Sequence, residues 1–259
     1  MLKRKLSYQE KQLINQLERF SINFCSPCFF GDFRDDNVKV NNGTITLIRY
    51  QGHRYGLTNY HVIDTFRERL RIEPSIKLNI GNQEVDLLDQ VISESIEFDL
   101  CIISLDNFSE TSFKSFGDVP TIFFDIDDFS LGSLEEGDFV VFGGYPGEWR
   151  LRPQANHLVF DTFSSGGSKV VLINEKFIKC ELALHECYIN MTQRNELPKI
   201  FGGLSGGPVF YRQKSSSGIE TFKMVGILCE FGENLGIFDI RPISLVNEDL
   251  TIKSLNSLS

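Results

Sequence analysis

The feature that most limits how this chain can fold is a series of short apolar or alternating segments after residue 36. The segments are separated by Gly, Asn, Asp and Pro, which favour turns. Two turn dipeptides, Gln51-Gly52 and Gly81-Asn82, lie between consecutive segments. Segments of this kind predict an all-β sandwich or barrel. The predicted strands are 44–50, 55–62, 76–80, 84–92, 100–105, 139–145, 157–163, 169–173, 186–192, 208–212, 223–230 and 236–240.

The predicted strands fall into two groups, separated by the polar segment 107–128. We expect each group to form one β unit. A helix is predicted over 7–20, where a capping-box pattern precedes an apolar stripe, and a short helix is predicted over 242–250. The expected organisation is an N-terminal helical extension, an N-terminal β-barrel, a C-terminal β-barrel and a C-terminal tail, over 1–36, 37–112, 113–245 and 246–259 respectively.

Composition limits the class of protein. The chain has 259 residues, of which 41% are hydrophobic and 24% charged, as in ordinary globular domains. Its net charge of −9 argues against nucleic-acid binding, which uses a basic surface. The sequence has neither an apolar run long enough to span a membrane nor a secretory signal pattern. We therefore expect a cytoplasmic protein with reduced cysteines and no membrane contact.

The strongest local signal is the sequence GGLSGGP at 202–208, with Ser205 at its centre. Glycines around a serine allow a tight turn whose backbone N–H groups converge on one point. An oxyanion hole needs this geometry, because its donors must face the oxygen that becomes negative. The alternative interpretation is a glycine-rich β-turn with an incidental serine.

Two other segments end or begin predicted strands with titratable residues. His61 follows the segment YGLTNY, and Asp99 immediately precedes an apolar strand. Taken singly, each residue fits an ordinary structural role at a strand end. Together with Ser205 they follow the order His, Asp, Ser, which is the chymotrypsin order among Ser-His-Asp hydrolases. A serine in an α/β-hydrolase would instead come first, on a strand-to-helix turn.

At these motifs the sequence resembles the trypsin-like, or chymotrypsin-fold, serine peptidases. The matching sequences are LTNYHV at 57–62, DLCII at 99–103 and GLSGGP at 203–208. The segments 43–48 and 136–147 also resemble strands of that family, so the likeness extends over roughly 40–245. The resemblance implies two antiparallel six-stranded β-barrels with the site in the cleft between them.

The resemblance also implies roles for the three residues. Ser205 would be the nucleophile, His61 the general base that activates it, and Asp99 the carboxylate that orients the imidazole. The backbone N–H groups of Gly203 and Ser205 would form the oxyanion hole. Leu204 stands where zymogen-activated members of the family carry an aspartate, so we expect no activation by insertion of a new N-terminus.

The substrate pocket is less readable. In the family, the strand at 226–232 lines this pocket, so Cys229, Glu230 and Phe231 are candidate substrate-binding residues. Lys199 near the pocket would favour an acidic substrate side chain, whereas Glu230 would favour a basic one. The sequence leaves both possibilities open, and Lys199 also fits an exposed loop charge.

The sequence Cys25-Ser-Pro-Cys28 is a CxxC motif. Zinc would require two more ligands, and Cys180, His185 and Cys187 match no common zinc spacing. A redox role would require a low-pKa thiol at a helix start. We expect incidental or structural thiols, with metal binding and redox chemistry as alternatives, and we expect no cofactor.

The leading hypothesis is a serine endopeptidase that acts on protein or peptide substrates through an acyl-enzyme. One alternative is a catalytically silent pseudo-protease that holds a peptide or partner in the barrel cleft. Another is a protease effector that stays inactive until a regulatory partner binds, with the N-terminal helix as the docking or inhibitory element.

Overall fold

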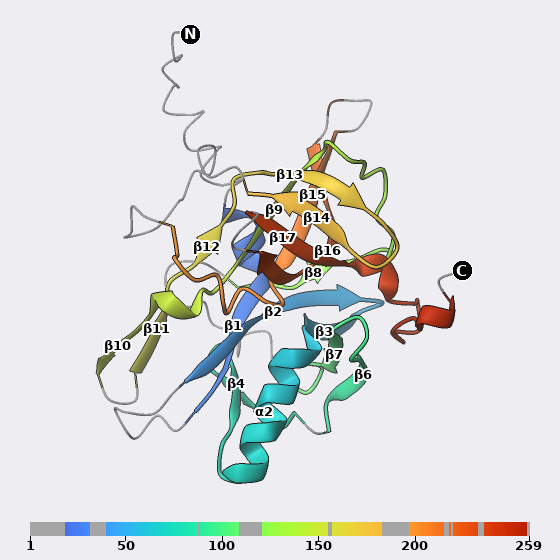
Figure 1. Ribbon diagram of the computed structural model, residues 1–259. Coiled ribbons are helices and arrows are strands. Elements are labelled where there is room, and N and C mark those ends of the chain that lie inside the picture. Colours follow the sequence, from blue (N-terminus) through green and yellow to red (C-terminus); the bar gives the residue numbers. More distant parts are fainter. Residues whose placement is uncertain are drawn as a thin grey trace.

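The computed structural model describes residues 19–31, 40–87, 89–108, 121–154, 157–182, 197–214, 218, 220–232 and 236–257. Two large β-sheets dominate this part of the chain. Figure 1 shows the sheet of the C-terminal half above the sheet of the N-terminal half, with helix α2 beside the latter. No helix within the described ranges is long and apolar enough to cross a membrane.

The first sheet has the strand order β5-β4-β1-β2-β3-β7-β6, and all these neighbours are antiparallel. The predicted turn dipeptide between β2 and β3 has positive φ at both Gln51 and Gly52, as a tight hairpin turn requires. A short parallel strand, β8, adds to β2. The strands are β1 (Cys25–Phe30), β2 (Asn41–Tyr50), β3 (His53–Thr58), β4 (Leu78–Ile80), β5 (Gln83–Val85), β6 (Val91–Ser95), β7 (Leu100–Ser104) and β8 (Phe124–Asp125).

The second sheet closes on itself. Its order is β9-β13-β14-β17-β16-β15, and β15 pairs again with β9, which makes a six-stranded antiparallel barrel. Strand β12 adds to β9, and β10 and β11 form a separate hairpin. These strands are β9 (Phe139–Gly144), β10 (Arg150–Gln154), β11 (His157–Phe160), β12 (Phe163–Ser164), β13 (Ser168–Ile173), β14 (Ile178–Glu181), β15 (Pro208–Lys214), β16 (Glu220–Gly232) and β17 (Ile237–Pro242).

The predicted all-β, two-barrel architecture is confirmed. The second unit is a closed barrel, and the first is a curled sheet whose end strands, β5 and β6, do not pair with each other within the described ranges. The predicted strand 186–192 lies outside the described residues. The chain therefore folds as two β units with a junction between them, as expected for the chymotrypsin-like arrangement.

Three predicted strands are partly wrong: 84–92 covers parts of the separate strands β5 and β6, 157–163 covers β11 and the start of β12, and 55–62 runs into a helix. The sequence predicts a single strand over 55–62, but β3 ends at Thr58 and helix α2 (Tyr60–Ile72) begins directly after Asn59. The helix buries Val62, Ile63 and Phe66, which share one face, and its other positions are largely polar. So narrow an apolar stripe gives a weak helical pattern, and the preceding strand obscures its start.

At the two ends of the chain, one expectation is untested and the structure adds two observations. The predicted helix over 7–20 lies outside the described residues except for Arg19 and Phe20. Strand β1 lies inside the expected extension 1–36, yet it pairs with β2 on one side and β4 on the other. At 242–250 the structure has a three-residue 3-10 turn, η4 (Ile243–Leu245), in place of a longer helix.

Four apolar clusters hold the described part of the molecule together, and the smallest contains Cys25 and Tyr145. One fills the first unit and includes Leu47 and Ile103, and a second fills the barrel around Phe142. A third joins the two units, because it contains Leu57 from β3 and Phe210 from β15. Burying a side chain of this size contributes about 1.5–3 kcal/mol. This shared cluster therefore fixes the two sheets against each other.

Candidate active site

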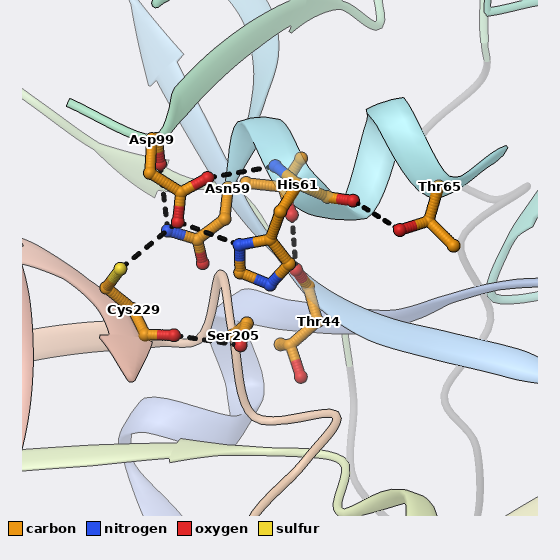
Figure 2. A network of polar contacts seen from close by, with 8 residues as sticks. Thr44, Asn59, His61, Thr65, Asp99, Ser205 and Cys229 are labelled. Carbon is orange, nitrogen blue, oxygen red and sulfur yellow. Dashed lines mark hydrogen bonds and ion pairs between the residues drawn. The ribbon is translucent and has the colours of Figure 1, made fainter. Parts of the chain in front are cut away.

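The three candidate catalytic residues come from three different elements of the two units. His61 lies in the first turn of α2, Asp99 precedes β7, and Ser205 lies in the loop before β15. Figure 2 shows them gathered around the His61 imidazole. They share a pocket of about 370 Å³, which lies in the size range of small-ligand sites. Its lining residues are His61, Asp99, Phe201, Gly202, Leu204, Ser205, Leu228, Cys229, Glu230, Phe231 and Phe238.

Asp99 binds His61 through both carboxylate oxygens. Oδ2 lies 2.8 Å from Nδ1 of the imidazole, and Oδ1 accepts the backbone N–H of His61 at 2.9 Å. The Asn59 amide donates to the backbone carbonyl of Asp99 at 2.9 Å. Asp99 also has a φ of 50°, in the left-handed region that is uncommon for residues other than glycine. These bonds fix the imidazole by its Nδ1 side and leave Nε2 for the pocket.

The Asp99 carboxylate accepts a further hydrogen bond, from the Cys229 thiol at 3.1 Å. Burial acts to raise the pKa of Asp99, but the bonds from His61 and Cys229 outweigh it, so this pKa lies below its usual value. Burial raises the pKa of the Cys229 thiol to about 12, which keeps it protonated at neutral pH. Asp99 is therefore an ionised acceptor, and Cys229 is one of its donors.

The hydroxyl of Ser205 has a different partner. Its Oγ donates to the backbone carbonyl of Cys229 at 2.9 Å. Within the described residues, no hydrogen bond joins this hydroxyl to the His61 imidazole. Catalytic hydrogen bonds are often long or misaligned before substrate binds.

The loop around Ser205 has the backbone that its glycines predict. Gly203 and Gly206 have φ values of 97° and 90°, which only glycine adopts readily. The carbonyl of Gly202 accepts from the N–H of Gly147, and that of Gly203 accepts from Thr44. Within the described ranges, the N–H groups of Gly203 and Ser205 donate to no protein acceptor. Two backbone donors beside the serine are thus free for an oxyanion.

Threonines of the first sheet anchor this loop across the junction. Thr44 donates its N–H to the carbonyl of Ser205 at 2.8 Å and its hydroxyl to the carbonyl of Gly203 at 2.7 Å. Thr46 donates to the carbonyl of Gly206 at 2.7 Å. Both threonines are fully buried, so these bonds lie away from competing water. The sequence did not single out these threonines, because they resemble ordinary residues of an alternating strand.

The candidate substrate-binding residues Cys229, Glu230 and Phe231 all line the pocket at Ser205. Lys199 does not line it; its backbone N–H donates to Glu148 Oε2 at 2.6 Å. Ile200 lines a second pocket of about 490 Å³ on another side of His61 and Ser205. Phe201 and Phe238 also line the first pocket, but no sequence signal marks them, because phenylalanines are common throughout this chain.

The CxxC motif lies on strand β1. Cys25 and Cys28 are three residues apart on a strand, so their side chains point to opposite faces. They belong to separate apolar clusters, and burial raises the pKa of both thiols. Two thiols on opposite faces cannot share one metal ion or form a disulfide without moving the strand. Cys187 and His185 lie outside the described residues.

Comparisons with known proteins give limited matches. No protein-family model and no curated protein matches the sequence. Among solved structures, the Rv3671c protease of M. tuberculosis in its active form aligns with 13% identity and a TM-score of 0.44, covering 93% of this chain and 88% of that one. Deg5 aligns with the same identity and score, covering 93% and 92%. The protease of tobacco vein mottling virus aligns with 14% identity and a TM-score of 0.41, covering 93% and 82%.

These structural similarities are distant, and the fold is assigned from the strand pairing. The second unit closes as a six-stranded antiparallel barrel, and the first is a curled sheet. The pocket at the junction receives His61 and Asp99 from the first unit and Ser205 from the second. The chain has the two-barrel fold of the trypsin-like serine peptidases, as the resemblance of its sequence implied.

Proposed function

We propose that this protein is a serine endopeptidase that hydrolyses peptide bonds through an acyl-enzyme. The observation that carries the proposal is that Ser205 lines one pocket with the Asp99-bound imidazole of His61, while the backbone N–H groups of Gly203 and Ser205 are unpaired within the described ranges. A serine hydroxyl needs an adjacent base to become a nucleophile, and the developing negative charge needs preorganised donors. A base and two donors therefore lie beside the same serine.

In the proposed mechanism, substrate binding accompanies rotation of the Ser205 hydroxyl from the Cys229 carbonyl toward Nε2 of His61. The imidazole takes the hydroxyl proton as Oγ bonds to the substrate carbonyl carbon. The N–H groups of Gly203 and Ser205 bind the resulting oxyanion, and Asp99 stabilises the imidazolium. The C–N bond then breaks as His61 returns the proton to the leaving amine. A water molecule, with His61 again as the base, then attacks the carbonyl carbon of the acyl-enzyme. The bond to Ser205 Oγ breaks, which releases the carboxylic acid and restores the serine hydroxyl.

Substrate backbone has a natural place beside β16. The pairing of β16 with β15 ends at Ile227, whereas its pairing with β17 continues as far as Gly232. The edge of Cys229–Phe231 that faces away from β17 is therefore available next to Ser205. We assign to these three residues the binding of an extended substrate by strand addition.

Two further parts of the proposal concern control and location. Leu204 has no charge to form the ion pair of zymogen activation, and it is buried in the apolar cluster of the barrel. We propose that the loop at 202–207 adopts its conformation without the insertion of a new N-terminus. Five cysteines of the described chain are unpaired and buried, which suits a reducing compartment such as the cytoplasm.

One observation favours a second candidate function. The Ser205 hydroxyl is turned toward the Cys229 carbonyl, which is compatible with a silent pseudo-protease or with an effector that requires a partner to realign its site. Such a protein would bind peptide in the same pocket without cleaving it. A regulatory partner acting through the N-terminal segment belongs to this alternative.

Covalent labelling with a small fluorophosphonate separates these possibilities. We expect Ser205 to be labelled, and we expect Ser205→Ala to abolish labelling and to lower peptide turnover by roughly 10⁶-fold. His61→Ala should also abolish labelling, because it removes the base. A wild-type protein that binds peptide but never reacts with the probe would contradict the peptidase proposal and support the silent form.

A further inference from the structure

The pocket beside Ser205 is apolar apart from the reacting groups and one exposed carboxylate. Five of its lining residues, Phe201, Leu204, Leu228, Phe231 and Phe238, are large and hydrophobic. We propose that it receives a large apolar side chain, such as Leu, Met or Phe, from the substrate residue whose carbonyl Ser205 attacks. This inference rests on the proposed peptidase function and names the substrate class of the same site.

Three phenylalanines form one wall of the pocket. The ring of Phe231 lies 4.3 Å from that of Phe201 and 4.4 Å from that of Phe238, measured between centroids. Phe201 and Phe238 also contact each other at 5.3 Å. Phe201 packs further on Phe163, and Phe238 packs on Phe142, both fully buried in the barrel core. The wall is therefore continuous with the core and cannot readily move aside to admit a charged group.

Within the described residues, the carboxylates that line this pocket are Asp99, which is bound to His61, and Glu230. Lys199 is exposed and its backbone is bound to Glu148, whose side chain lines the second pocket. Arg241 does not line the pocket, although its charge acts on the nearby Cys229 thiol and its Nε is buried. Glu230 does line the pocket, but it is exposed, and water there solvates its carboxylate.

These positions resolve the two possibilities that the sequence left open. An acidic side chain would require a cation among the lining residues, and a basic one would require a buried carboxylate other than Asp99, which already binds His61. An unpaired charge that enters an apolar pocket loses hydration without compensation, whereas an apolar side chain gains from leaving water. A hydrophobic pocket discriminates by about 10–200-fold for each methylene-sized difference. Substrates with a large apolar side chain at this position should therefore react faster at Ser205 than substrates with alanine or a charged side chain.

The test uses tripeptidyl phosphonate probes that differ only in the side chain next to phosphorus: Leu, Phe, Ala, Asp or Lys. The measured quantity is the second-order rate constant for covalent modification of Ser205 by each probe. We expect the Leu and Phe probes to react at least about tenfold faster than the Ala, Asp and Lys probes. A faster Lys or Asp probe, or an Ala probe equal to the best, would overturn the inference.

A small fluorophosphonate without a peptide separates this inference from the proposed function. If it labels Ser205 while the peptide probes show no apolar preference, only the pocket assignment fails. If neither it nor any peptide probe reacts, the proposed function fails, and this inference fails with it.

A substitution in the pocket wall provides a second measurement. Phe231→Ala removes one ring of the wall and should lower the ratio of the Phe-probe rate to the Ala-probe rate by about tenfold. The matched control is Phe139→Ala, because Phe139 is 55% exposed on β9 and does not line the pocket. The control should keep the wild-type ratio, and an unchanged ratio in Phe231→Ala would count against the assignment.

Discussion

Asp99 illustrates how much a single residue can specify in this molecule. Its two carboxylate oxygens bind the ring and the backbone of His61, and a thiol from the other unit adds a third donor. Its backbone is held in the left-handed region, and Asn59 binds its carbonyl. The imidazole is therefore positioned by the conformation of one residue, which is itself bonded from both barrels.

A substitution of Asp99 tests this role. Asn is the natural replacement, because it tolerates a positive φ and has nearly the same shape. We expect Asp99→Asn to lower kcat by roughly 10⁴-fold, since the carboxylate no longer sets the tautomer of His61. At neutral pH it should also lose about 1–3 kcal/mol of unfolding free energy through the lost charged hydrogen bonds.

The pH dependence of that loss follows from the pKa of Asp99. Folding lowers this pKa below its ordinary value of 3.8, so ionised Asp99 stabilises the fold above that pH. The contribution disappears as the pH falls through the lowered pKa. Denaturant titrations should therefore show the wild type and Asp99→Asn converging in stability below pH 3.8, and a gap that stays constant there would contradict the assigned shift.

At the scale of elements, the loop at 202–207 and helix α2 determine where the reacting groups lie. The loop is shaped by glycines that have no room for a side chain. A Cβ on Gly206 would lie 2.0 Å from the carbonyl oxygen of Thr44, and one on Gly207 would lie 2.1 Å from that of Gly143. Close approach of backbone to backbone therefore requires glycine here, independently of any chemistry.

Gly206→Ala should be strongly destabilising. It combines a positive φ of 90° with a clash against Thr44 backbone, and we expect a loss of about 3 kcal/mol or more. Gly137→Ala is the matched control, because Gly137 has a φ of 97° and a Cβ added there would meet no other atom within 4 Å. The control should cost only about 1–2 kcal/mol. Equal losses in thermal or chemical unfolding would mean that the contact with Thr44 contributes nothing.

Helix α2 shows why some elements could not be predicted. Asn59 is a favourable N-cap residue, but its side chain makes no capping bond and instead binds the Asp99 carbonyl. The helix stays in place through a narrow apolar face, so tertiary packing decides its conformation more than local propensity does. The sequence predicted a strand at His61, whereas this residue lies in the first turn of helix α2.

At the scale of the whole molecule, alternation and turn residues were enough to predict two β units. Periodicity marks which side chains are buried, and dipeptides such as Gln51-Gly52 mark where strands reverse. The curled first sheet and the role of Thr44 were not predictable, because they depend on contacts between residues far apart in the chain. The aromatic wall could not be predicted for the same reason, because Phe201, Phe231 and Phe238 come together only when three segments of the chain meet.

The position of strand β1 determines how the N-terminal segment can be tested. Removing residues 1–36 would delete β1, whose six residues are all buried between β2 and β4, so we expect that variant to lose cooperative unfolding. Removing 1–18 keeps β1 and also Phe20, which stacks on Phe222 at 3.9 Å. Because the described residues that line the pocket at Ser205 all lie after residue 18, we expect this shorter deletion to preserve fluorophosphonate labelling within about twofold of wild type. A tenfold rise in labelling would instead identify the segment as inhibitory.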